Sequence, residues 1–184
     1  MVSKDQLLTM GHQYLAIAIQ YYIAGRSAVF AQSVPVAGNL LHHAAEMLLK
    51  FLLIKNSYSA DQFKNKFGHD LNKLWSEVKS IVKDSTLDKF DELLSGLNDF
   101  EDLRYPGKGY MISISVHRCK LPEVPKEFAE KEFVETKQYQ TCLEDIDEFV
   151  SAVLTDRVNP EWIKMLIRGD ALEQYKKDNK HPFF

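Results

Sequence analysis

The sequence is poor in cysteine. Its 184 residues include only Cys119 and Cys142, which stand apart from each other and from any Cys-x-x-Cys or Cys/His cluster. This pattern excludes a disulfide scaffold and the common zinc motifs, and it favours a reducing compartment.

The sequence also lacks an apolar run near the roughly 18 residues that span a bilayer, and its start lacks the apolar core of a secretion signal. We therefore expect a cytoplasmic protein that does not enter a membrane.

The common catalytic and nucleotide-binding signatures are missing as well. The chain has no Gly-x-x-x-x-Gly-Lys loop, no Gly-x-Gly-x-x-Gly turn, no His-Glu-x-x-His pair and no Gly-x-Ser-x-Gly elbow.

A net charge of -3 and a pI of about 6.1 argue against strong non-specific binding of nucleic acid. The charge is uneven, however, because residues 50–83 are rich in lysine and residues 123–148 are rich in acidic side chains. The simplest interpretation is two solvated faces of opposite sign.

What the sequence does contain is sustained helical periodicity. The chain is 45% apolar and 27% charged, which is typical of one globular domain over residues 1–184. Apolar residues recur at helical spacing through most of its length, which predicts an all-α fold, an up-and-down bundle of five or six helices. The expected helices cover residues 4–24, 35–55, 70–83, 85–105, 135–155 and a last segment after Pro160.

Several residues are expected to mark helix ends. Gly25 is a plausible stop for the first helix, and Pro35 suits the first turn of the second. Asp70 can cap the third helix, and Asn159 followed by Pro160 can open the last one. The helix at 35–55 is apolar on two sides, so we expect it to be the most buried.

Two segments depart from the bundle pattern. Within residues 107–125, an extended insertion or arm, apolar and polar residues alternate near 110–118, as in a strand. Its apolar side needs cover from the bundle or from a second chain. Residues 159–184 form a C-terminal helix and tail, which we expect to fray unless a partner holds Phe183 and Phe184.

The densest polar cluster lies in the apolar central helix. His42 and Glu46 are four residues apart, as are Glu46 and Lys50, so each pair can meet on one helix face. Three interpretations are open: an exposed ion pair, two ligands of a metal that needs a third, or charged groups that find partners inside the fold. The third is the best motivated, because unpaired charge on so apolar a helix is costly.

Three motifs, in order, carry a family resemblance. They are Ala-Gly-Asn-Leu-Leu-His-His-Ala-Ala-Glu with Leu-Lys at residues 37–50, Phe-Gly-His-Asp-Leu at 67–71 and Asp-Leu-Arg-Tyr-Pro at 102–106. With the first helix, this part of the chain, about residues 4–106, resembles the HEPN (higher eukaryotes and prokaryotes nucleotide-binding) domain. The resemblance implies an up-and-down helical bundle that often forms homodimers.

The family includes metal-independent endoribonucleases whose signature is Arg, four to six residues, then His. No arginine of this sequence is followed by histidine at that spacing. The resemblance therefore implies a non-catalytic binding or interaction module, for a nucleotide or RNA phosphate or for a nucleotidyltransferase partner. The alternative is a toxin-like, metal-independent endoribonuclease with a rearranged site, in which His69 or His117 serves as acid and base and Arg104 or Arg118 holds the phosphate.

The candidate ligand-binding or phosphate-binding residues are Glu46, Lys50, His69, Arg104 and Tyr105. In an up-and-down bundle the second helix ends, the third starts and the fourth ends at the same end of the molecule, so we expect this set to converge. The cluster either fixes how the helices align with one another, which is a structural role, or forms an anion-binding cleft. We favour the structural role because no phosphate-binding loop is present. We expect no catalytic residue, no metal and no cofactor.

Overall fold

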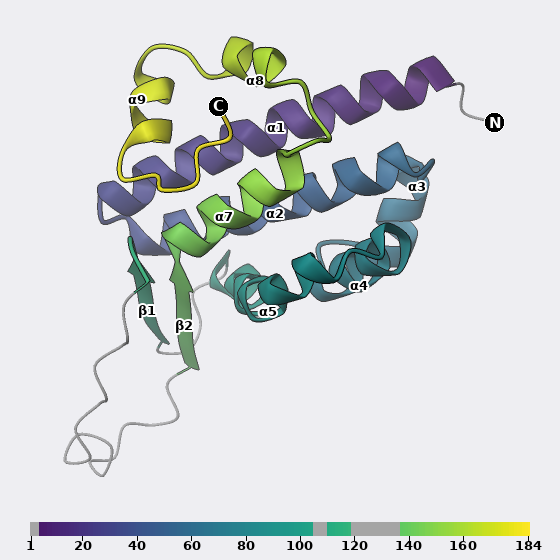
Figure 1. Cartoon of the computed structure of the whole chain (residues 1–184). Coiled ribbons are helices and arrows are strands. Elements are labelled where there is room, and N and C mark those ends of the chain that lie inside the picture. Colours follow the sequence, from purple (N-terminus) through teal and green to yellow (C-terminus); the bar gives the residue numbers. More distant parts are fainter. Residues whose placement is uncertain (1–3, 105–109, 119–136) are drawn as a thin grey trace.

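The computed structural model describes residues 4–104, 110–118 and 137–184, and it is a helical bundle with a small sheet at one end (Figure 1). The all-α class is confirmed, but the described residues contain eight α-helices, not five or six. The α-helices are α1 (Lys4–Phe30), α2 (Val34–Lys55), α3 (Ala60–Gln62), α4 (Leu71–Val82), α5 (Asp91–Asp99), α7 (Leu143–Leu154), α8 (Pro160–Leu166) and α9 (Asp170–Lys176). A π-helical turn (Phe63–Phe67) and two 3-10 turns (Ser85–Phe90 and Phe100–Arg104) complete the helical part.

The long hairpin of α1 and α2 forms the centre of the bundle (Figure 1). The expected stop at Gly25 is wrong, because α1 continues to Phe30. Gly25 serves packing instead: a Cβ there would lie 2.7 Å from Leu41 Cδ2, so the missing side chain lets α2 approach closely. Pro35 does occupy the first turn of α2, and most of α2 is buried, as its two apolar faces predicted.

The remaining helices pack on both sides of this hairpin. α4 and α5 lie along α2, whereas α8 and α9 lie over α1 (Figure 1). The predicted caps are confirmed: the Asp70 carboxylate accepts from the Lys73 N–H at 3.0 Å, and the Asn159 side chain accepts from the Glu161 N–H at 2.9 Å. These caps define where α4 and α8 begin.

A two-stranded parallel sheet stands at one end of the bundle (Figure 1). Strand β1 (Tyr110–Ser115) pairs with β2 (Lys137–Cys142), with Ile112 opposite Tyr139. The expectation of an extended element at 110–118 is confirmed, and its apolar side is covered by this chain's own core, against which Ile112 and Ile114 pack. The helix expected from residue 135 is wrong over residues 137–142, because pairing with a distant strand overrides the local pattern. Residues 107–109 and 119–125 of the proposed arm lie outside the described residues.

The C-terminal segment is held by the chain itself. The single C-terminal helix expected within residues 159–184 is divided into α8 and α9, which are separated at Gly169 with its φ of +55°. The expected fraying of the tail is wrong: Phe184 stacks on Tyr175 with ring centroids 4.9 Å apart, and the Phe183 N–H donates to the Tyr175 hydroxyl. An aromatic side chain on α9 therefore supplies the contact that we had assigned to a partner.

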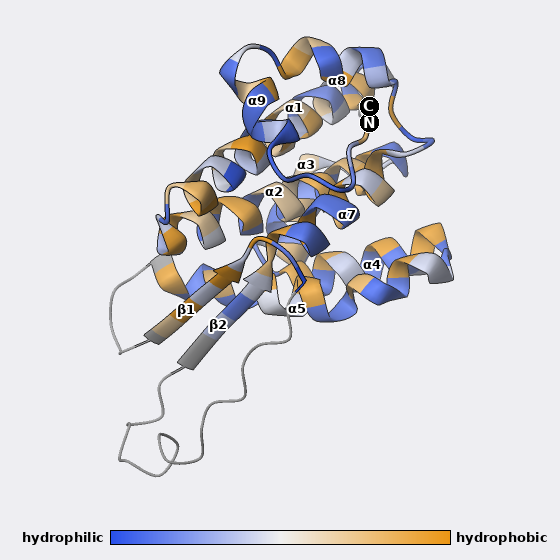
Figure 2. Cartoon of the chain, turned by 60° about the vertical axis from the view of Figure 1, so that its left-hand side comes forward, coloured by the Kyte–Doolittle hydropathy of each residue, from blue (hydrophilic) through white to orange (hydrophobic). Residues whose placement is uncertain are grey.

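Apolar and polar residues are interleaved around the helices, as the colours of Figure 2 show. Within the described ranges, no helix combines the length and the hydropathy that are needed to cross a membrane.

Candidate functional site

The site is built around the carboxylate of Glu46, which lies in the middle of α2 and is fully buried. Lys50, one turn further along α2, donates to Glu46 Oε1 at 2.5 Å. His43 Nδ1 lies 3.2 Å from Glu46 Oε2, and His69 Nδ1 lies 3.0 Å from Oε1. One carboxylate thus accepts hydrogen bonds from three basic side chains.

Two elements position these groups. His43, Glu46 and Lys50 share one face of α2, whereas His69 comes from the turn that precedes α4. The Lys50 ammonium also donates to the carbonyl oxygen of Gly68 at 3.0 Å, which ties this turn to α2. Gly68 adopts a φ of +59° there, a conformation that glycine accepts without strain.

The electrostatics of the cluster keep Glu46 ionised. Burial by itself raises the pKa of the Glu46 carboxyl, but hydrogen bonds from His43 and Lys50 and the charge of Lys50 lower this pKa to about 2. Since a carboxylate only accepts hydrogen bonds, the Nδ1 atoms of both His43 and His69 must carry the proton. Their Nε2 atoms are then the reactive ends of the two rings. The His69 side chain is 57% exposed and that of His43 is 23% exposed.

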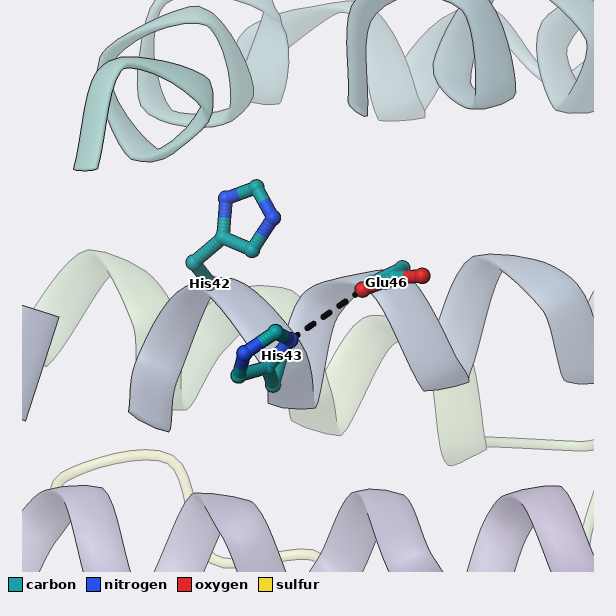
Figure 3. A group of neighbouring side chains, drawn as sticks. All are labelled: His42, His43 and Glu46. Atoms are coloured by element: carbon teal, nitrogen blue, oxygen red, sulfur yellow. Dashed lines mark hydrogen bonds and ion pairs between the residues drawn. The ribbon is translucent and has the colours of Figure 1, made fainter. Parts of the chain in front are cut away.

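His42 does not join this cluster, contrary to the spacing argument. Its ring is buried, its Nδ1 donates to the carbonyl oxygen of Leu97 at 2.9 Å, and its Nε2 lies 3.5 Å from the Glu101 carboxylate. Figure 3 shows the His42 ring projecting away from the bond between His43 and Glu46. Burial lowers the pKa of His42. The residue that meets Glu46 is therefore His43 at i,i+3, because position 42 faces the end of α5.

The buried Lys50 ammonium competes with a metal ion at this cluster. In the described part of the chain, His42, His43 and Glu46 are the one group whose potential ligand atoms approach within 4.8 Å of one another. Glu46 is already committed to the Lys50 ammonium, whereas His42, whose Nδ1 donates to the carbonyl oxygen of Leu97, keeps only its Nε2 for a ligand role. A metal would have to displace a buried cation from Glu46.

The predicted constellation is partly observed. Glu46, Lys50 and His69 do converge. The backbone of Arg104 ends a 3-10 turn, but its side chain and the whole of Tyr105 lie outside the described residues. Two of the alternative residues of the rival ribonuclease site, His117 and Arg118, lie beside the start of α7. The Arg118 guanidinium is already neutralised there by the carboxylates of Glu144, Asp145 and Glu148.

Sequence reasoning missed a second polar cluster. Arg26, on α1, is fully buried, pairs with Asp147 of α7 and donates to the carbonyl oxygens of Gln174 and Lys177. The Tyr22 hydroxyl donates to Asp147 at 2.7 Å. The spacing of Tyr22 and Arg26 puts both on one helix face, but no local pattern indicates a partner more than a hundred residues away. His43 could have been found from its three-residue spacing to Glu46.

Comparisons with known proteins give no match for this chain among protein-family models, curated proteins or solved structures.

Proposed function

We propose that this protein is a non-catalytic, HEPN-like binding module that contacts a phosphate group of a nucleotide or RNA through His69 and His43. The observation that carries the proposal is the buried, ionised Glu46, which orients two partly exposed imidazoles from two different elements. Glu46 fixes the orientation of both rings, and an imidazolium donates hydrogen bonds to phosphate oxygens.

The surroundings of His69 support binding of an anion. Lys64, Lys66 and Lys73 are exposed within five residues of His69 on the π-helical turn and the first turn of α4. Lys66 and Lys73 are paired with Glu77 and Asp70 at the surface, at 2.8 and 3.1 Å. Such exposed pairs are weak, so a phosphate group can compete for these lysines at little cost.

Fluorescence polarisation with a short, labelled single-stranded RNA tests this proposal. His69→Gln should weaken binding about tenfold, the scale of one charge-assisted hydrogen bond. Lys176→Gln, which removes an exposed cation from α9, is the control and should bind like the parent. Equal affinity of the parent and His69→Gln would contradict the proposal.

The rival function, a metal-independent endoribonuclease, is favoured by the same oriented imidazoles, because a histidine held by a carboxylate is a common general acid or base. The two functions differ in the fate of the RNA. Incubation of RNA with the protein in EDTA, analysed on a denaturing gel, should leave the RNA intact if the protein only binds. Cleavage that His69→Gln abolishes would instead support the ribonuclease.

We further propose that the protein is cytoplasmic, as its cysteine pattern favours, and that it is a homodimer or the partner of a nucleotidyltransferase, as the family resemblance implies. Light scattering tests the homodimer directly. We expect a mass near twice the 21.2 kDa of one chain at high micromolar concentration. A mass of one chain under these conditions would reject the homodimer.

A further inference from the structure

We propose that a second site, a pocket between α1, α2 and the start of α8, binds a small aromatic carboxylate. The pocket has a volume of about 330 Å³, at the lower end of the range of about 300–1,000 Å³ found for small-molecule sites. It is lined by apolar side chains from all three helices and from the loop before α8: Leu8, Leu15, Phe51, Val158 and Trp162. It is separate from the Glu46 cluster, none of whose residues lines it.

The walls of the pocket favour a flat, apolar ligand. The His12 and Trp162 rings lie 5.4 Å apart and are tilted by 30°, and Phe51 closes the pocket from α2. Aromatic rings prefer offset or edge-to-face contacts with other rings at this spacing. Gly11 also lines the pocket, and a Cβ there would lie 3.9 Å from the Phe51 ring.

The charge of the lining selects an anion. Its ionisable side chains are His12, Lys55 and Arg157, so every such group among the described residues of the pocket is basic. The Arg157 guanidinium is already used, because it donates to the carbonyl oxygen of Ala152 at 2.9 Å and lies 3.8 Å from the Asp84 carboxylate.

Lys55 is therefore the group that would bind the carboxylate. Its ammonium donates to the carbonyl oxygen of Arg157 at 2.7 Å, which holds it beside the pocket. An ammonium has three donors, so two remain for a ligand carboxylate. No carboxylate of the described residues forms an ion pair with Lys55.

Titration with 1-naphthoate, followed by the indole N–H signals in a nitrogen–proton correlation spectrum, tests the site. The chain has two tryptophans, and Trp75 is an internal control because its indole N–H is bonded to Asp91, away from the pocket. We expect 1-naphthoate to shift the Trp162 signal and to leave the Trp75 signal in place. A shift of both signals, or of neither, would overturn the proposal.

Comparison of two ligands and of matched variants distinguishes the contribution of charge to binding from that of aromatic stacking. The neutral isostere 1-naphthamide should bind about tenfold more weakly than 1-naphthoate to the parent protein. Lys55→Gln should remove this preference, whereas Lys164→Gln, a matched change on the exposed side of α8, should preserve it. His12→Ala should weaken both ligands, and Gln13→Ala should weaken neither. Equal binding of the two ligands to the parent would show that the pocket does not select a carboxylate.

Discussion

At the scale of single residues, the energetics of this protein centre on Glu46. A buried carboxylate is tolerated only when its charge is matched and its oxygens accept hydrogen bonds, and here Lys50, His43 and His69 do both. Lys50 is buried too, so each member of the pair depends on the other. Losing one partner is expected to be worse than losing both.

Glu46→Gln tests this dependence. The amide keeps the shape of the side chain but leaves the Lys50 ammonium buried without a counter-charge, so we expect a loss of about 3–5 kcal/mol in the free energy of unfolding. Urea unfolding measures it. The double variant Glu46→Leu with Lys50→Met should recover most of the loss, because it removes both charges. Glu161→Gln, at an exposed pair, should cost less than about 1 kcal/mol.

The same carboxylate makes the stability of the protein depend on pH in the acid range. The pKa of Glu46 is lowered from the ordinary 4.5 to about 2 in the folded protein, which corresponds to about 3 kcal/mol of stability. Because the folded-state pKa is the lower one, this contribution is present above pH 4.5 and is lost as pH falls from 4.5 to about 2. We expect the parent to lose more stability over this window than Glu46→Gln, as measured by urea unfolding at each pH. Parallel losses in the two proteins would contradict the lowered pKa.

At the scale of secondary-structure elements, glycines on the long helices set how closely their neighbours approach. Gly38 lies on α2 against Phe100, at the start of the 3-10 turn that follows α5; a Cβ there would lie 1.9 Å from Phe100 Cδ1. Gly11 on α1 differs, because a Cβ there would meet Ile54 at 3.5 Å, an ordinary contact. The same substitution should therefore have opposite effects at the two positions.

Gly38→Ala should lower the free energy of unfolding by at least about 2 kcal/mol, because Phe100 must leave its place. Gly11→Ala should raise it by up to about 1 kcal/mol, since alanine is the better helix former and nothing has to move. Both values come from urea unfolding. Combining Gly38→Ala with Phe100→Leu should restore part of the loss if the clash with the ring is its cause.

At the scale of the whole molecule, Arg26 joins the first helix to the last quarter of the chain. Its guanidinium pairs with Asp147 on α7 and donates to the carbonyl oxygens of Gln174 and Lys177, at the end of α9. The tail beyond α9 then folds back onto Tyr175. The C-terminal elements are thus held by polar contacts with α1 as well as by apolar packing.

Arg26→Met should lower the free energy of unfolding by about 3–5 kcal/mol, because it leaves Asp147 buried without its partner. Hydrogen exchange should localise the effect, with faster exchange of the amides in α9. Arg168→Met, at an exposed position between α8 and α9, is the control and should stay within about 0.5 kcal/mol of the parent. Unchanged exchange in α9 would show that Arg26 does not hold this segment.

Local information in the sequence determined the helical class, the caps at Asp70 and Asn159, the buried central helix and the pairing of Glu46 with Lys50. Each depends on residues within about one helical turn of each other, where spacing alone decides which side chains meet. Tertiary contacts were needed to establish that residues 137–142 form a strand, that His43 rather than His42 meets Glu46, and that Arg26 binds Asp147. These three features depend on contacts between segments that lie far apart in the chain. They are the register of a strand, the helix face that turns toward a distant neighbour and the partner of a buried charge. A single sequence carries no local pattern for such contacts.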